Sequence, residues 1–207
     1  MPPCFTSGAG HRILSDMRIV LSSIILCAAI IPGCSQRSAL PKLYAVPAAN
    51  LVASSGRDFN LSSLREKVVI YDFIFTRCGG TCPLMTMSMK RLTRQIDPQL
   101  PVRFVTITVD PTHDSPAVLQ EFARRQGGDP RWLFLTGNPA GVTELSVKGF
   151  KLAAGPGGGP GSEVLIHSSK LVLADRSGTI RGYYDGTDPL AVEKLNADIR
   201  DLARERV

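Results

Sequence analysis

Several short segments rich in apolar, β-branched and aromatic residues predict the strands of a sheet. Residues 68–75 and 102–109 are almost continuously apolar, a pattern typical of strands buried on both faces in the middle of an α/β sheet. Residues 132–135 predict a shorter third strand. Further on, residues 164–174 and 179–184 flank the turn sequence Asp-Arg-Ser-Gly, so they predict a β-hairpin near the C-terminus.

Helices are predicted between these strands, and each begins with a proline in its first turn. Proline fits there because the missing N–H has no partner inside the helix. The residue pairs at the four helix starts are Cys82-Pro83, Ser115-Pro116, Asn138-Pro139 and Asp188-Pro189. Ser115, Asn138 and Asp188 are also favourable N-cap residues. The first helix has a stripe of apolar residues, spaced as one face of a helix that packs on a core: Met85, Met89, Leu92 and Ile96.

Strands and helices alternate along the chain, which predicts an α/β fold with a central mixed β-sheet flanked by helices. The terminal hairpin supplies the antiparallel strands. Residues 155–161 consist of glycine and proline alone. Such a stretch holds neither a helix nor a central strand, so it predicts a loop that ends shortly before His167.

The N-terminal region predicts a secretory signal peptide over residues 1–33. An uncharged apolar run at 19–31 follows Arg12 and Arg18 and precedes Pro32 and Gly33. The run is shorter than the roughly 20 apolar residues that a spanning helix needs. Met17 is a second candidate start, because residues 1–16 are typical of neither a leader nor a domain.

The sequence Ile31-Pro32-Gly33-Cys34 resembles the cleavage site of bacterial lipoproteins. This resemblance implies that Cys34 carries the lipid. The mixed polar, proline and alanine composition that follows predicts a membrane tether over residues 34–50, with the folded domain over 51–207. The alternative is a short uncleaved anchor. Both place the domain at the extracytoplasmic, periplasm-facing surface of a bacterial membrane.

Composition and charge narrow the function classes. The 207 residues are 43% hydrophobic and 20% charged, which supports one domain with a core. The formal net charge is +6, but the lysine and arginine residues are scattered along the chain. A scattered excess favours a solvated surface near anionic lipid, or an acidic partner, over nucleic-acid binding.

Two of the five cysteines remain as thiols in the predicted domain. Cys4 and Cys27 leave with the leader and Cys34 takes the lipid, so Cys78 and Cys82 remain. They lie between a buried strand and a helix start, where helix N–H groups and the helix dipole favour the thiolate. If the intervening turn is helical, the two sulfurs share one face and can reach one ion or each other. The pair is therefore a metal site or a redox dithiol. A structural disulfide is the other alternative, but one closing so short a loop adds little stability.

Two histidines remain outside the leader. His167 lies in the predicted strand 164–174, and a lone strand histidine is normally a packed or surface residue. His113 lies near Asp110 and Asp114, which suggests a metal cluster. The adjoining Ser115-Pro116 helix start favours a simple turn there.

Three sequence blocks, taken together, resemble the Sco/SenC family. These are thioredoxin-like proteins tied to assembly of the binuclear copper centre of cytochrome c oxidase. The matching residues are Cys78, Cys82 and Pro83; Asp110, Pro111, Asp114, Ser115 and Pro116; and His167 with Ser168. The resemblance covers residues 50–205 and implies a thioredoxin-like fold, with copper bound by Cys78, Cys82 and His167. It further implies a copper chaperone that delivers the metal to the oxidase subunit with the binuclear copper site. The sequence identifies no upstream donor.

The donor chemistry agrees with this expectation. Two thiolates and an imidazole suit Cu(I), with Cu(II) as the second oxidation state, whereas a closed zinc site takes four ligands. The chain departs from the family at Ile166, where an acidic residue is common, at Arg77 and Gly79-Gly80, and in its glycine-rich stretch. These departures leave the ligand set intact and the partner open.

Three functions compete for the dithiol. The first is a copper carrier that is not a turnover enzyme. The second is a thiol–disulfide oxidoreductase that keeps partner cysteines reduced for metallation. The third is a thiol peroxidase, for which Thr76 and Arg77 lie on the wrong side of Cys78. Oxidoreductases usually separate their thiols by two residues, and here there are three, which favours metal binding.

Overall fold

The computed structural model describes residues 40–152, 154–157 and 164–205, with the backbone alone at 154–157 and 164–167. The described residues belong to one compact unit, Gln36–Val207. The leader, the candidate start at Met17 and Cys34 lie outside the described residues. Within the described part of the chain, no helix is long and apolar enough to cross a bilayer.

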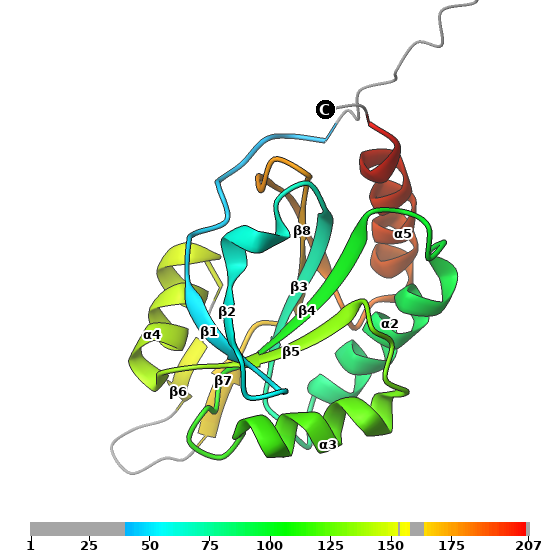
Figure 1. Cartoon of the computed structure of the whole chain (residues 1–207). Helices are drawn as coiled ribbons and strands as arrows, with labels where there is room; N and C mark the ends of the chain where they lie inside the picture. The colour runs from blue at the N-terminus through cyan, green and yellow to red at the C-terminus, as the bar shows by residue number, and fades with distance from the viewer. Residues whose placement is uncertain (1–39, 153, 158–163, 206–207) are drawn as a thin grey trace, which may run out of the picture. The chain divides into compact units, whose positions relative to one another are not determined.

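A seven-stranded mixed sheet, in the order β2-β1-β5-β4-β3-β8-β9, forms the centre of the fold (Figure 1). Its strands are β1 (Asn50–Ala53), β2 (Asp58–Asn60), β3 (Val68–Ile74), β4 (Val102–Thr108), β5 (Trp132–Thr136), β8 (Lys170–Ala174) and β9 (Ile180–Asp185). The three central strands β3, β4 and β5 run parallel, and the outer pairs are antiparallel. Every residue of β3 is buried, as its continuous apolar run predicts. The predicted α/β fold with a central mixed sheet and a C-terminal hairpin is confirmed.

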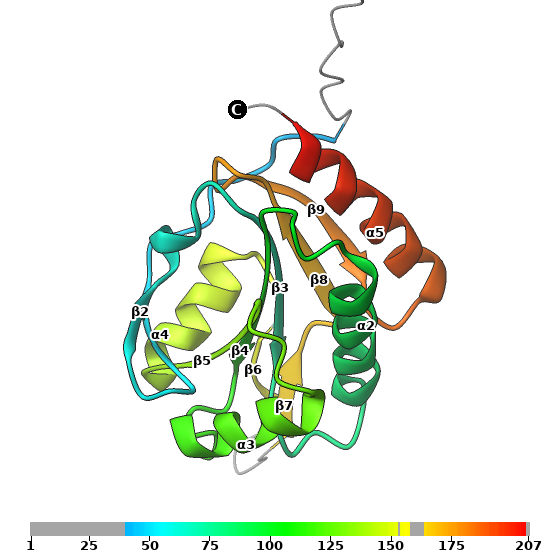
Figure 2. The ribbon, with the colours of Figure 1, turned by 45° about the vertical axis from the view of Figure 1, so that its right-hand side comes forward.

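Helices cover both faces of this sheet (Figures 1 and 2). They are η1 (Leu61–Leu64), α2 (Cys82–Gln95), α3 (Pro116–Gln126), α4 (Pro139–Glu144), which continues into η2 (Leu145–Gly149), and α5 (Pro189–Arg204). One core cluster lies beneath α2, α3 and α5, and the other lies beneath η1, α4 and η2. The four predicted proline-led starts are confirmed. The side chains of Ser115, Asn138 and Asp188 cap α3, α4 and α5 by accepting backbone N–H bonds.

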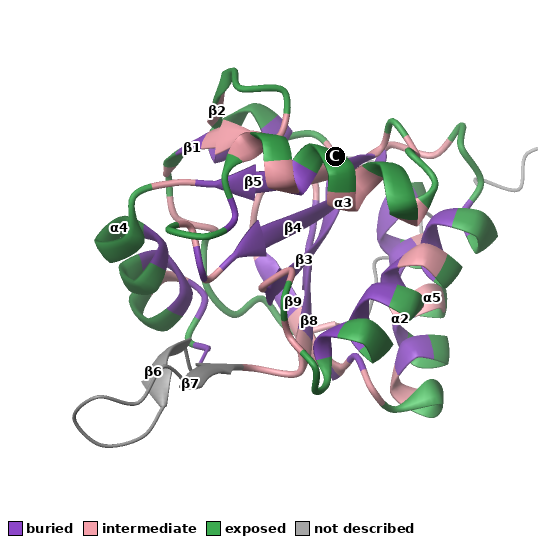
Figure 3. Cartoon of the chain, turned by 90° about the horizontal axis from the view of Figure 1, so that it is seen from below, coloured by how far each residue is buried: buried purple, intermediate pink, exposed green. Residues whose placement is uncertain are grey.

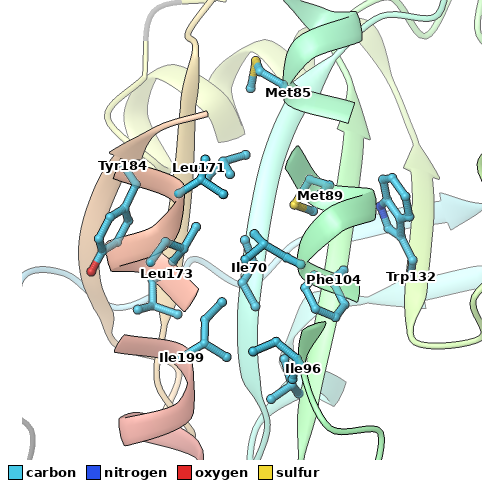
Figure 4. Packing of buried hydrophobic residues seen from close by; sticks show 14 of the residues in the cluster. Ile70, Met85, Met89, Ile96, Phe104, Trp132, Leu171, Leu173, Tyr184 and Ile199 are labelled. Carbon is cyan, nitrogen blue, oxygen red and sulfur yellow. The ribbon is translucent and has the colours of Figure 1, made fainter. Parts of the chain in front are cut away.

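The predicted stripe on α2 faces the core. Met85, Met89, Leu92 and Ile96 are at most 1% exposed. Met89 and Ile96 pack over Ile70 of β3 and Phe104 of β4, as Figure 4 shows. Each buried side chain of this size contributes roughly 1.5–3 kcal/mol. This packing fixes α2, and therefore its first residue Cys82, against the central strands.

The prediction of one strand over residues 164–174 is wrong. The structure has two, β7 (Val164–His167) and β8, which are separated at Ser168 and Ser169. The Lys170 N–H donates to Ser168 Oγ (3.2 Å), and the Gly186 N–H donates to the Ser169 carbonyl (2.8 Å). The first bond stabilises a turn between β7 and β8, and the second attaches that turn to the segment after β9. The two serines interrupt the apolar pattern of residues 164–174 only briefly, so the break between the strands could not be predicted from the sequence.

The strand β7 pairs with β6 (Ala154–Gly157) in a separate two-stranded ribbon. Part of the predicted glycine–proline loop is therefore a strand, although it is neither a helix nor a central strand, as expected. A ribbon with open edges tolerates proline and glycine because few of its N–H groups are needed for pairing. Residues 158–161 of that stretch lie outside the described part.

The segment before β1 binds along the start of β9. The Leu43 N–H donates to the Ile180 carbonyl (2.9 Å), and the Ile180 N–H donates to the Tyr44 carbonyl (2.7 Å). The buried Arg181 donates to the carbonyls of Leu40 and Pro41 and pairs with Asp175 at 2.9 Å. From Leu40 onward, the segment expected to be a tether is thus hydrogen-bonded to the domain.

Candidate metal centre

Cys78 and Cys82 lie at the carboxyl end of the central strand β3. A short loop follows β3, and α2 begins at Cys82. The Cys78 N–H donates to the Phe75 carbonyl (3.2 Å), which turns the loop back over the end of the strand. Ligands of α/β proteins bind outside the carboxyl ends of the sheet strands. The sequence-predicted dithiol is therefore brought together at the edge where this architecture places its sites.

The two cysteines differ in burial. Both are thiols; Cys82 is only 3% exposed, whereas Cys78 is half-buried. Burial raises the pKa of the Cys82 thiol far above its usual range. Its hydrogen bond with Cys78 and the charges of Cys78 and Asp72 raise it further. Burial of Cys82 thus opposes the thiolate that the helix start is expected to favour. A metal that binds Cys82 has to displace its proton.

A pocket of about 260 Å³ opens beside the dithiol, between the first turns of α2 and the end of α3. Its lining residues are Phe75, Thr76, Cys78, Cys82, Pro83, Thr86, Met87, Phe122 and Gln126. Apart from the thiol sulfurs of Cys78 and Cys82 and the thioether sulfur of Met87, the wall is mostly apolar or weakly polar. The sulfurs are thus the strongest donors for a soft metal ion in this pocket.

The segment that contains Asp110, His113 and Asp114 supports the dithiol loop. Asp114 is fully buried and accepts hydrogen bonds from the Thr76 N–H (3.0 Å), the Thr76 hydroxyl (2.5 Å) and the Thr108 hydroxyl (2.5 Å). His113 Nδ1 lies 2.9 Å from Asp114 Oδ1, and Ser115 caps α3. The turn interpretation of this segment is confirmed, since the Asp114 carboxylate is already committed to the threonines.

Arg77 also contacts this segment. Its Nε lies 2.9 Å from Asp110 Oδ2. The arginine that a peroxidase would need at its thiol is therefore held by a carboxylate on the neighbouring turn. The structure gives no support to the peroxidase alternative.

Sequence analysis missed Asp72, a buried carboxyl group on the same side of β3 as the core beneath α2. Asp72 is 0% exposed, and neither of its oxygens forms a well-aligned hydrogen bond with a described residue. Burial raises the pKa of Asp72 to about 7, although the Thr106 hydroxyl is near enough to lower this pKa in part. An aspartate inside an otherwise apolar strand was the available sequence signal, since ionisable residues in such places are often functional.

The structure places the backbone of His167 at the end of β7, opposite Ala154. Its side chain lies outside the described residues. Among the side chains that the structure does describe, no three His, Cys, Asp or Glu residues gather as a metal site. The dithiol is thus observed, and its combination with His167 stays a prediction.

Comparison with known proteins defines the class. The SCO1/SenC family model matches residues 44–204, so the chain belongs to the SCO1/SenC family and has its thioredoxin-like fold. A SCO1/SenC family lipoprotein from Bacillus anthracis is 29% identical, with a TM-score of 0.71 over 77% of this chain and 95% of that one.

Two further solved structures are similar to this chain. BsSco, a member of the Sco family of cytochrome c oxidase assembly proteins in which a disulfide switch was identified, is 28% identical. Its TM-score is 0.68 over 81% of this chain and 98% of that one. Yeast Sco1 with copper bound is 26% identical, with a TM-score of 0.60 over 76% and 90% of the two chains.

Proposed function

We propose that this protein is a copper chaperone, which binds Cu(I) through Cys78, Cys82 and His167. The copper is its cargo, delivered to the cytochrome c oxidase subunit that carries the binuclear copper site. The observation that carries the proposal is the dithiol at the end of β3, open to a pocket, in a chain of the SCO1/SenC family. Soft thiolates with one imidazole suit Cu(I), and three ligands leave the ion exchangeable.

Hydrogen bonds near His167 support its part in the site. The Gly186 N–H donates to the carbonyl of Ser169, two residues after His167, and Ser88 of α2 donates to the Gly186 carbonyl (2.7 Å). A Cβ atom at Gly186 would lie 3.2 Å from Met85 Cγ and 3.0 Å from Leu171 Cγ, so glycine permits this close approach. The turn after β7 is thereby linked to the first half of α2, the helix that begins at Cys82.

We also propose an extracytoplasmic, membrane-anchored location, through lipid on Cys34. The leader pattern at residues 1–33 supports it, as does the similarity to a family lipoprotein. The anchor would hold the carrier at the membrane surface, where a membrane-bound oxidase exposes its copper-receiving domain.

Thiol–disulfide exchange is a second candidate function, favoured by the hydrogen bond between the two thiols. The more exposed Cys78, as thiolate, would attack a partner disulfide and release one partner thiolate. Cys82 would then lose its proton and attack Cys78 of the mixed disulfide, releasing the second partner thiolate. Two electrons pass to the partner, which gains two thiols as the Cys78–Cys82 disulfide forms.

Copper delivery separates the two functions. The full chain in detergent, reduced and loaded with one equivalent of Cu(I), is mixed with the copper-free, reduced oxidase domain, and copper in that domain is followed after separation. We expect close to stoichiometric transfer. The control is the reduced, copper-free chain mixed with the oxidised domain and a copper chelate. If this mixture metallates the domain equally well, and the loaded chain keeps its copper, the reductase function replaces the carrier function.

A further inference from the structure

A second hollow lies beside the dithiol pocket, between α2 and the N-terminal end of α5. Its volume is about 550 Å³, and its walls include Leu84, Met87, Arg91, Arg94, Thr187 and Val192. In Figure 3, α2 and α5 lie next to each other with exposed residues along their outer faces. We call this hollow the α2–α5 groove.

Apolar side chains are exposed at the end of the groove nearest the thiols. Leu84 is 51% exposed and Met87 is 66% exposed, although the neighbouring Met85 is fully buried. Leu84 and Met87 are three residues apart and so lie on one helix face, opposite the buried stripe. Adjacent exposed apolar side chains rimmed by polar groups mark interaction sites.

The other end of the groove is positively charged. Lys90, Arg91 and Arg94 line it, and no described carboxylate lies within ion-pair distance of any of them. The helix α2 itself contains no Asp or Glu. By contrast, the exposed cations Arg124 of α3 and Lys148 of η2 are paired with nearby glutamates. Three clustered cations without a counter-charge favour an acidic partner.

The groove adjoins the dithiol pocket. Met87 lines both hollows, and Cys82 is the first residue of the helix that forms one wall of the groove. A protein bound in the groove therefore has its surface beside Cys78 and Cys82. A second copy of this chain suits the groove poorly, because the chain has a net charge of +6.

We propose that the α2–α5 groove docks the protein that receives the copper. The docking surface of that protein is acidic and presents an apolar side chain to Leu84 and Met87, with its carboxylates facing Lys90, Arg91 and Arg94. This inference rests on the proposed function and deepens it, since it names the surface and the partner chemistry of the delivery step.

Binding of the copper-free oxidase domain to the full chain in detergent tests the groove. The variants are Arg91→Glu/Arg94→Glu and Leu84→Ser, whose side chains line the groove but not the dithiol pocket. The matched control is Arg57→Glu/Arg65→Glu, with the same charge change at two exposed positions that line neither hollow. We expect the first two variants to bind at least about tenfold more weakly, with their circular dichroism unchanged. The control should bind like the wild type. Wild-type affinity should fall as salt rises from about 50 to 300 mM, because salt screens exposed charges.

Three outcomes overturn the proposal. One is equal binding by both groove variants and the wild type. Another is an equal loss of binding in the control variant, which would show that the net charge of the chain, and not the groove, determines the affinity. The third is a wild-type chain that does not bind the oxidase domain. In that case, loss of binding to phosphatidylglycerol vesicles in Arg91→Glu/Arg94→Glu would assign the groove to a lipid surface. Loss of self-association in the ultracentrifuge in the same variant would assign it to a second copy of the chain. Cu(I) titration of the same variants separates this failure from that of the carrier function, because an intact carrier binds one Cu(I) in every case.

Discussion

Replacing His167 with alanine is expected to weaken Cu(I) binding by more than about 100-fold. Loss of a group that merely supports a metal ligand already costs roughly 10–100-fold, and loss of a ligand should cost more. Formation of the Cys78–Cys82 disulfide should be largely unaffected, since it needs only the two sulfurs. The measurement is competition for Cu(I) with a chromophoric chelator, using the full chain under reducing conditions.

His113 provides the matched control for this prediction. It is the other histidine of the domain, and its ring contacts Asp114 on the supporting turn. His113→Ala should leave the Cu(I) affinity within about threefold of wild type, because the turn retains its threonine bonds to Asp114. Equal Cu(I) affinity in His167→Ala and wild type would remove His167 from the site and favour thiol–disulfide exchange.

Replacing Asp72 with asparagine is expected to raise the free energy of unfolding by about 3 kcal/mol at pH 8, with little change at pH 4. The folded-state pKa of about 7 lies above the ordinary value of 3.8. The stabilising effect of the raised pKa is fully present below pH 3.8 and is lost as the pH rises through 7. Each pKa unit corresponds to about 1.36 kcal/mol, which sets an upper bound near 4 kcal/mol. Asparagine cannot ionise, so it avoids this loss.

Denaturant unfolding of both proteins between pH 4 and pH 8 measures the difference. The control is Asp58→Asn at an exposed position of β2, where a substitution should change stability by no more than about 0.5 kcal/mol. An Asp72→Asn variant that is less stable than wild type at pH 8 would show that a partner such as the Thr106 hydroxyl stabilises the carboxylate by more than burial destabilises it.

The central strands and the helix starts were predictable because local sequence determines them. A strand buried on both faces must be apolar throughout, as β3 is, and proline with a capping residue identifies a helix start such as that of α3. The position of Cys78 and Cys82 at the end of β3 followed from the same two rules. For these parts, local preference and tertiary structure agree.

Other features depend on which segments meet in space. The break at Ser168 and Ser169 is maintained by a bond to Gly186, which is distant in sequence. The raised pKa of Cys82 comes first from its burial, which depends on the tertiary packing around it and not on the local sequence of the helix start. The α2–α5 groove likewise arises from the contact of two helices that are remote in the chain.

X-ray absorption at the copper edge tests the three-ligand site most directly. The sample is the full chain, reduced and loaded with one equivalent of Cu(I). We expect two sulfur scatterers and one imidazole nitrogen for each copper ion, with one of the sulfurs lost in Cys82→Ser. A spectrum with no sulfur scatterers, or one that is unchanged in Cys82→Ser, would contradict the three-ligand site.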